Sequence, residues 1–137
     1  MKALVLTPDP VDEPRLRSAL GDELEGAEIL VVSPATNESR LAFWMSDPDE
    51  AIAEADEAKA ATVAALQQAG AKADGEVGES EPGLALQDAM ATFPAERIVI
   101  VTRTDGERDY REDAQLAGAE QQYGVPVTWL EISPSAT

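Results

Sequence analysis

The 137 residues suffice for one domain, residues 1–137, that buries roughly two-thirds of the surface exposed by the unfolded chain. The composition, with 44% hydrophobic and 27% charged residues, is typical of a folded globular chain. The sequence contains neither cysteine nor histidine, which excludes disulfides, zinc thiolate sites, thiol catalysis and every Ser-His arrangement. The 27 acidic against 10 basic residues give a net charge of −17, which repels phosphate backbones and anionic lipid surfaces, so neither nucleic acid nor a membrane is an expected partner.

The first part of the chain contains two apolar strands separated by a short helix. Leu4 to Leu6 and Ile29 to Val32 are apolar at every position and do not alternate with polar residues. Such runs are typical of strands that a parallel sheet buries on both faces. Residues Glu13 to Leu20 between them are predicted to form the first helix.

A long helix is predicted from Asp47 to Gly70. Asp47 can cap it, Pro48 suits its first position and Glu50 can close a capping box. About 22 helical residues span about 33 Å. One face is expected to turn to the sheet and the opposite face to water. The first carries Ile52, Ala55, Val63 and Leu66, and the second carries Glu50, Glu54 and Glu57.

The next strand has a weaker pattern than the first two. Ala73 to Val77 is predicted to be extended mainly because the spacing of the elements requires a strand there. A helix then begins near Pro82 and ends before Pro94. Three of its residues fall at i, i+4 and i+7 and predict a buried stripe. They are Leu86, Met90 and Phe93.

The last part of the chain contains two strands and one helix. Ile98 to Val101 repeats the continuous apolar pattern, and Arg111 to Tyr123 is predicted as a helix that the run Gly124-Val125-Pro126 ends. Val127 to Ile132 mixes Thr128 and Glu131 into its apolar residues, which indicates an edge strand with one partly open side. An open edge can pair with a further strand.

The order of these elements predicts an α/β fold. Five strands alternate with four helices, and right-handed crossovers make such a chain a three-layer, doubly wound sandwich around a five-stranded parallel sheet. The apolar runs of four to five residues are far shorter than the roughly 20 needed to cross a bilayer. Lys2 to Leu6 is also too short for the core of a signal peptide, so a cytoplasmic location is expected.

Ligands of open α/β sheets bind beyond the carboxyl ends of the strands, where the strand order reverses. Three loops are expected there, at Thr7 to Asp12, Ser33 to Ser46 and Thr102 to Tyr110. These loops and their flanks hold four of the ten basic residues and could accept a small anionic ligand. The four are Arg40, Arg103, Arg108 and Arg111. The alternative, which we favour, is that they pair as solvated charges with neighbouring acids, as exposed pairs commonly do. Those acids are Glu38, Asp105, Glu107 and Asp109.

Aromatic and acidic residues before the long helix suggest two further sites, each with a simpler alternative. Phe43 and Trp44 could stack a planar ligand such as adenine, or could staple the loop onto the helix. Asp47 and Asp49 could hold a hard cation, but capping already explains them, and no metal site is expected. Neither a GxGxxG fingerprint nor a P-loop occurs.

The chain resembles the universal stress protein family over its whole length. The resemblance is carried by Ala69 to Ala73, Glu76 to Pro82, Ile98 to Arg103 and Gly124 to Val127. It implies the strand order 3-2-1-4-5, a homodimer through the edge strand Val127 to Ile132, and a role in stress or regulation.

Members that bind ATP carry an acidic residue after the first strand and a Gly-x2-Gly-x9-Gly-[Ser/Thr] motif after the fourth. Asp9 is similar to the acidic residue. Arg103 stands at the first glycine and Gly106 at the second, while the final Gly-[Ser/Thr] pair is missing, since Gly118 is followed by Ala119. The resemblance therefore implies the fold, but the phosphate cradle is incomplete and no cofactor is expected, with ATP as the alternative.

Two functions remain open on the sequence. The first, which we favour, is a non-enzymatic binding or regulatory protein. The second is an ATP-binding protein with weak hydrolase activity, whose phosphate site has been modified. A response-regulator receiver is disfavoured, because Val77-Gly78 provides no acceptor aspartate and Ile132-Ser133-Pro134 no lysine. No catalytic residue is predicted, and the candidate ligand-binding residues are Thr7, Asp9, Ser33, Arg40, Trp44, Arg103, Gly106 and Arg108.

Overall fold

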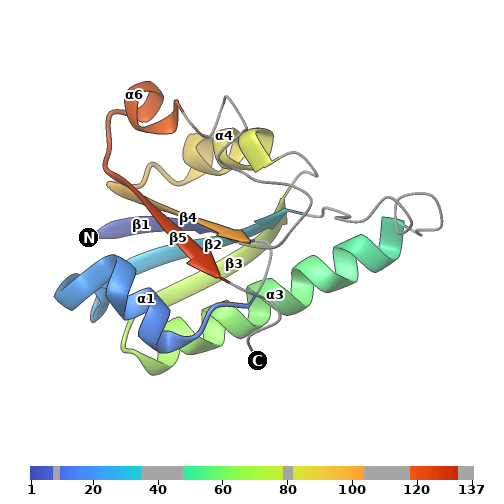
Figure 1. Ribbon diagram of the computed structural model, residues 1–137, viewed down its shortest axis with the longest axis horizontal. Helices are drawn as coiled ribbons and strands as arrows, with labels where there is room; N and C mark the ends of the chain where they lie inside the picture. Colours follow the sequence, from blue (N-terminus) through green and yellow to red (C-terminus); the bar gives the residue numbers. More distant parts are fainter. Residues whose placement is uncertain (8–9, 35–47, 79–81, 104–117, 133–137) are drawn as a thin grey trace.

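The computed structural model describes residues 1–7, 10–34, 48–78, 82–103 and 118–132 (Figure 1). Five strands alternate with helices along the described part of the chain, as predicted. The strands are β1 (Lys2–Leu6), β2 (Glu28–Pro34), β3 (Lys72–Gly78), β4 (Arg97–Arg103) and β5 (Val127–Ile132). The helices are α1 (Glu13–Leu20), the 3-10 helix η1 (Gly21–Leu24), α3 (Pro48–Gln68), α4 (Pro82–Thr92) and α6 (Ala119–Tyr123).

The strands form one parallel sheet in the order β3-β2-β1-β4-β5. This order, the doubly wound topology and the position of β5 at an edge confirm the prediction. β1 lies at the centre, where Leu6 pairs with Val32 of β2 on one side and with Ile100 of β4 on the other. The strand order reverses between β1 and β4, so that the carboxyl edge beside these two strands is the place where a ligand is expected.

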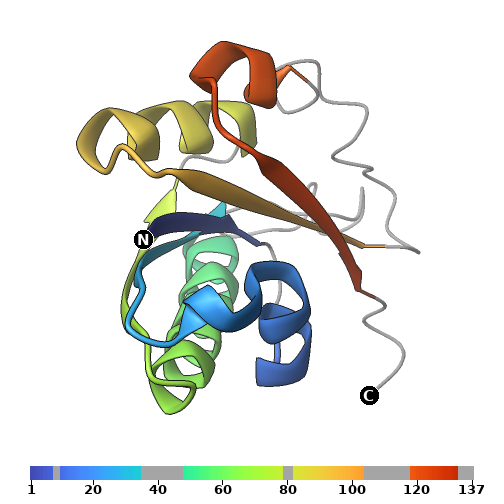
Figure 2. The ribbon, with the colours of Figure 1, turned by 90° about the vertical axis from the view of Figure 1, so that its left-hand side faces the viewer.

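The helices cover both faces of the sheet and produce two hydrophobic cores (Figure 2). α1 and α3 pack on one face, and α4 and α6 on the other. Since side chains alternate along each strand, odd positions of β1 face the first layer and even positions face the second. The first core contains Ala3, Val5, Leu16, Leu20, Ile29, Val31, Leu66, Val99 and Val101 among others, and the second contains Leu4, Leu6, Val32, Leu86, Ala89, Ile98, Ile100 and Ala119 among others.

The predicted faces of the helices agree with the packing wherever their side chains are described. On α3, Ala55 and Leu66 are buried, Val63 packs against the first core and Glu57 is exposed. On α4, Leu86 is buried, while Met90 and Phe93 are only partly buried and pack against the second core. The 3-10 helix after α1 was not predicted.

The ends of the predicted elements were less accurate than their order. The weak strand proved to be longer than predicted and forms an edge of the sheet. The predicted helix Arg111 to Tyr123 is described only from residue 118, where α6 spans five residues before Gly124 ends it in the left-handed conformation. Within the described ranges, no helix is both long enough and apolar enough to cross a membrane.

The end of β3 lies close to α4. A Cβ atom added at Gly78 would lie 2.9 Å from Ala85 Cβ and 2.9 Å from Val32 Cγ1. Both neighbours are short, buried side chains that cannot swing away. The absence of a side chain at Gly78 therefore allows α4 to pack directly on the sheet.

We predict that Gly78→Ala lowers the free energy of unfolding by about 1–3 kcal/mol, because the new methyl group overpacks this contact. Ala85→Gly removes the opposing methyl group and by itself costs about 1 kcal/mol of helix propensity. In urea unfolding, the double variant should be more stable than the sum of the two single effects predicts. Additive effects, or a Gly78→Ala variant as stable as the wild type, would show that the contact is not tight.

Candidate functional site

The carboxyl ends of β1 and β2 bring two buried hydroxyl groups to neighbouring positions. Thr7 directly follows β1, and its N–H donates to the carbonyl oxygen of Val32 at 3.0 Å. Leu6 pairs with Val32, so Thr7 and Ser33 occupy the next level of the sheet. By alternation, both side chains share the face that carries Val5 and Val31, the face covered by α1 and α3. Apolar strands thus end in polar side chains at the predicted ligand edge.

Ser33 has a property that packing does not explain. Its residue is 0% exposed, and within the described part of the chain its Oγ has no hydrogen-bond partner. A buried hydroxyl group without a partner costs roughly 1–3 kcal/mol. An alanine at this position would avoid this cost. The hydroxyl group at the end of β2 is therefore a candidate for contact with a ligand.

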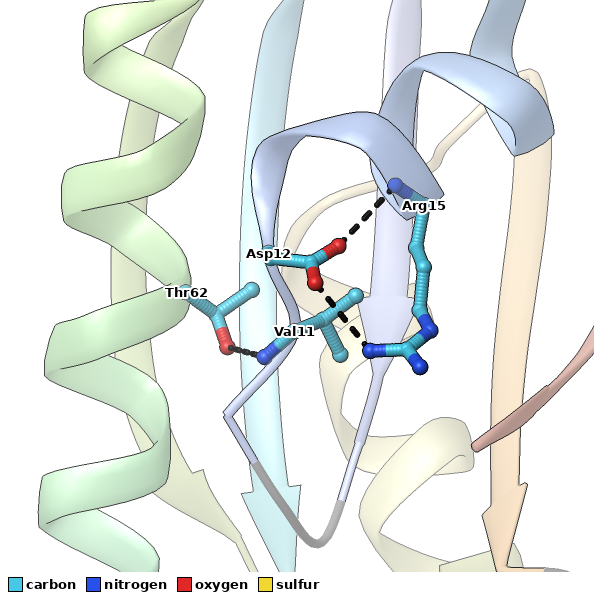
Figure 3. Close-up of polar contacts among 4 residues, drawn as sticks. All are labelled: Val11, Asp12, Arg15 and Thr62. Atoms are coloured by element: carbon cyan, nitrogen blue, oxygen red, sulfur yellow. Dashed lines mark hydrogen bonds and ion pairs between the residues drawn. The ribbon is translucent and has the colours of Figure 1, made fainter. Parts of the chain in front are cut away.

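A hydrogen bond from Val11 to Thr62 joins the chain just before α1 to α3 (Figure 3). The N–H of Val11 donates to Oγ1 of Thr62 at 3.1 Å, and both residues are buried. Asp12 caps α1 by accepting from the N–H of Arg15 at 3.1 Å, and its other carboxylate oxygen pairs with the Arg15 guanidinium at 3.1 Å. These contacts hold the entry into α1 beside the sheet edge.

The structure places only some of the predicted site residues. Thr7 and Ser33 lie together at the carboxyl edge, as described above. The backbone of Arg103 ends β4 at the same edge, and its side chain lies outside the described residues. Asp9, Arg40, Trp44, Gly106 and Arg108 also lie outside them, as do Arg111 and the side chains of the acidic segment at the start of α3.

Sequence reasoning missed two residues that shape this edge. Asp12 was not assigned as a helix cap, although an aspartate followed two residues later by proline is a usual signal for a helix start. Thr62 was not noticed at all. Its signal was a polar residue on the face of α3 that also carries Ala55, Ala58 and Leu66, where an apolar residue was expected.

One titratable group with a shifted pKa lies in the described part of the chain, away from the carboxyl edge. Burial raises the pKa of the Tyr123 phenol, but Tyr123 ends α6 and so precedes the amino end of β5, at the opposite edge of the sheet. Among the described residues, no group of three or more acidic side chains is arranged to hold a metal ion.

Comparison with known proteins supports the fold. No protein-family model matches the sequence, and no significant match is found among curated proteins. A universal stress protein from Archaeoglobus fulgidus aligns with a TM-score of 0.64 and 22% identity over 95% of this chain and 98% of that one. A structure described as the universal stress protein from Archaeoglobus fulgidus in complex with dAMP aligns with a TM-score of 0.63 and 22% identity, over 95% and 97% of the two chains. A hypothetical protein aligns with a TM-score of 0.53 and 11% identity over 99% and 98%. The chain therefore has the fold of the universal stress proteins, as the resemblance implied.

We predict that Asp12→Ala lowers the free energy of unfolding by about 1 kcal/mol, since the first turn of α1 loses its capping acceptor. Asp12→Asn is the matched control, because asparagine also caps helices and the exposed ion pair with Arg15 contributes little. Thermal and urea unfolding should show the alanine variant clearly less stable than the asparagine variant. Equal loss in both variants would mean that the ion pair, and not the cap, stabilises α1.

Proposed function

We propose that this chain, which has the fold of the universal stress proteins, is a non-enzymatic protein that binds an adenine nucleotide and prefers a monophosphate to a triphosphate. The ligand binds at the carboxyl edge of the sheet, where β1, β2 and β4 end. Its binding serves regulation and not turnover.

The buried hydroxyl group of Ser33 is the observation that carries this proposal. It lies beside Thr7 at the edge where doubly wound sheets bind ligands, and no described residue satisfies it. A polar ligand atom that donates to or accepts from Ser33 Oγ offsets the cost of burying this group. Two polar residues at the ends of otherwise apolar strands are the arrangement expected of a site with few, well-placed polar groups.

An adenine nucleotide is supported by the comparison and by the composition of the loops. The universal stress protein from Archaeoglobus fulgidus in complex with dAMP shares this fold. In the present sequence, Trp44 is the proposed stacking partner of the base, and Asp9 is proposed to accept from the ligand. A further proposed contact is Arg40, which follows β2 in the sequence, and the remaining ones come from the segment at and after the end of β4. They are Arg103, Gly106 and Arg108.

The preference for a monophosphate follows from charge and from the missing glycines. A triphosphate needs a series of backbone N–H donors, and the Gly-[Ser/Thr] pair that ends the family's phosphate motif is absent here. The net charge of −17 also repels a triphosphate more strongly than a monophosphate. Arginines at Arg103 and Arg108 are proposed to balance the smaller charge.

Absence of turnover is expected because the chain offers no general base of the usual kind. The sequence has no histidine or cysteine. A cytoplasmic location and a role in a stress response agree with the sequence and belong to the same proposal.

Calorimetric titration with AMP and with ATP plus magnesium tests the proposed function. We predict that AMP binds in the micromolar range, that ATP binds at least several times more weakly, and that neither is hydrolysed. The difference should shrink as salt increases, since salt screens the repulsion of the triphosphate. Tighter binding of ATP with release of phosphate would favour the hydrolase alternative, and no heat with either nucleotide would contradict nucleotide binding.

Ser33→Ala tests the contribution of the buried hydroxyl group. The variant should bind AMP about 2–10 times more weakly, the usual effect of losing one neutral hydrogen bond. Its thermal midpoint should not fall, because an unsatisfied group has been removed. Ser18→Ala, at an exposed position on α1, is the control and should bind as the wild type does. Unchanged affinity of Ser33→Ala would remove Ser33 from the site.

A homodimer through β5 is the proposed assembly, and the hydrogen bonds at the β3 edge make that other edge less suited to pairing with a further strand. At the β3 edge, Gln67 Nε2 donates to the carbonyl oxygen of Ala73 at 3.2 Å, and the N–H of Gly75 donates to Asp74 Oδ1 at 2.8 Å. Lys72 N donates to Ala27 O, so alternation points the Ala73 and Gly75 groups away from β2. Two groups that a further strand would use are thus already occupied at β3.

Light scattering on Thr128→Asp tests this assembly. Thr128 lies near the middle of β5, where two antiparallel copies of the strand would meet and place the new carboxylates close together. The wild type should have the mass of two chains and the variant the mass of one. Thr92→Asp, exposed on α4, adds the same charge and should stay dimeric. A monomeric wild type, or a dimeric Thr128→Asp, would rule out this interface.

A further inference from the structure

Thr62 is the only polar side chain of α3 that is buried among the described residues, and it makes two hydrogen bonds there. Its Oγ1 donates to the carbonyl oxygen of Ala58 at 2.8 Å, one helical turn earlier. The same oxygen accepts from the N–H of Val11 at 3.1 Å (Figure 3). The first bond uses the hydroxyl proton and so leaves the oxygen lone pairs for Val11.

The second bond gives a partner to the N–H of Val11, a residue that belongs to no helix or strand. Val11 lies between β1 and α1 and is buried, so its N–H cannot turn to water. The bond joins segments 51 positions apart in sequence. A valine side chain at position 62 would fill the same space and would leave this N–H without a partner.

Hydrogen bonds therefore hold two backbone N–H groups in the segment between β1 and α1. Thr7 N–H is bound to Val32 on the strand side, and Val11 N–H is bound to Thr62 on the helix side. Between these anchors the sequence reads Pro8-Asp9-Pro10. Proline has no N–H, so Pro8 and Pro10 add no backbone donor that would need a partner.

We infer that Thr62 is a positioning residue for the nucleotide site. It touches no ligand, but its bond to Val11 holds the entry into α1 in place beside Thr7 and the end of β1, where the ligand is proposed to bind. This inference rests on the proposed function and adds to it a residue of α3 that lies outside the three loops of the sheet edge. A segment that is already ordered in the free protein binds a ligand more tightly than a disordered one, because it loses less conformational entropy on binding.

The test compares Thr62→Val with Thr62→Ser in calorimetric titrations with AMP. Valine keeps the shape and removes the acceptor, while serine keeps the acceptor and removes only a methyl group. We expect Thr62→Val to bind AMP about tenfold more weakly, and Thr62→Ser to bind within about twofold of the wild type. Amide hydrogen exchange without ligand should be faster at Val11 in the valine variant than in the serine variant.

A matched control separates loop positioning from general loss of stability. Ile29→Val creates a small defect near the amino end of β2, at the opposite edge of the sheet, and costs about as much stability as a lost hydrogen bond. It should bind AMP as the wild type does. If Ile29→Val weakens binding as much as Thr62→Val, or if both position-62 variants bind equally well, the inference is overturned while the proposed function stands. A wild type that binds no nucleotide overturns both.

Discussion

Burial of the central strands on both faces is the constraint on which the rest of this structure depends. β2, β1 and β4 carry apolar side chains at nearly every position, and such strands are stable in water only if helices cover both sides of the sheet. The α1 and α3 layer and the α4 and α6 layer meet that requirement. Polar side chains are consequently excluded from the middle of these three strands and lie where the strands end, so the same constraint also creates the polar edge.

The polar edge then depends on how the chain leaves the sheet. β1 ends at Leu6, and two buried residues, Thr7 and Val11, lie between it and α1, so their backbone N–H groups need partners within the protein. Val32 and Thr62 each satisfy one of these groups. Ser33 shows the opposite case, since its hydroxyl group is buried at the same edge with no described partner. The two hydrogen bonds stabilise the fold, whereas the buried Ser33 hydroxyl group without a described partner does not.

The sequence predicted the strands that its composition sets apart. The continuous apolar runs identified β1, β2 and β4, because short runs that are apolar at every position are typical of parallel strands buried on both faces. It was weaker at β3, whose Lys72, Asp74 and Glu76 dilute the pattern, and the spacing of neighbouring elements supplied the prediction. The reason for the glycine at the end of β3 is not visible in the sequence, because it depends on the packing of Gly78 against Ala85 of α4.

The candidate site was predicted less completely, for a physical reason. The end of a strand can be read locally, and Thr7 and Ser33 were found in that way. A hydrogen bond between Val11 and Thr62 depends on how α3 packs beside the entry to α1, which no local pattern in either segment encodes. The arginines and Trp44 were named from their positions in the loops expected at this edge and lie largely outside the described residues, so their part in the site stays a prediction.

The central claim is that a nucleotide binds at the carboxyl edge beside β1 and β2, and mapping of backbone amide NMR shifts during addition of AMP tests it most directly. We predict saturable shift changes concentrated at Thr7, Val11 and Ser33, with little change at Lys2, Glu28 and Arg97 on the amino edge. Shift changes confined to the amino edge or to the outer faces of the helices, or no changes at millimolar AMP, would contradict the account.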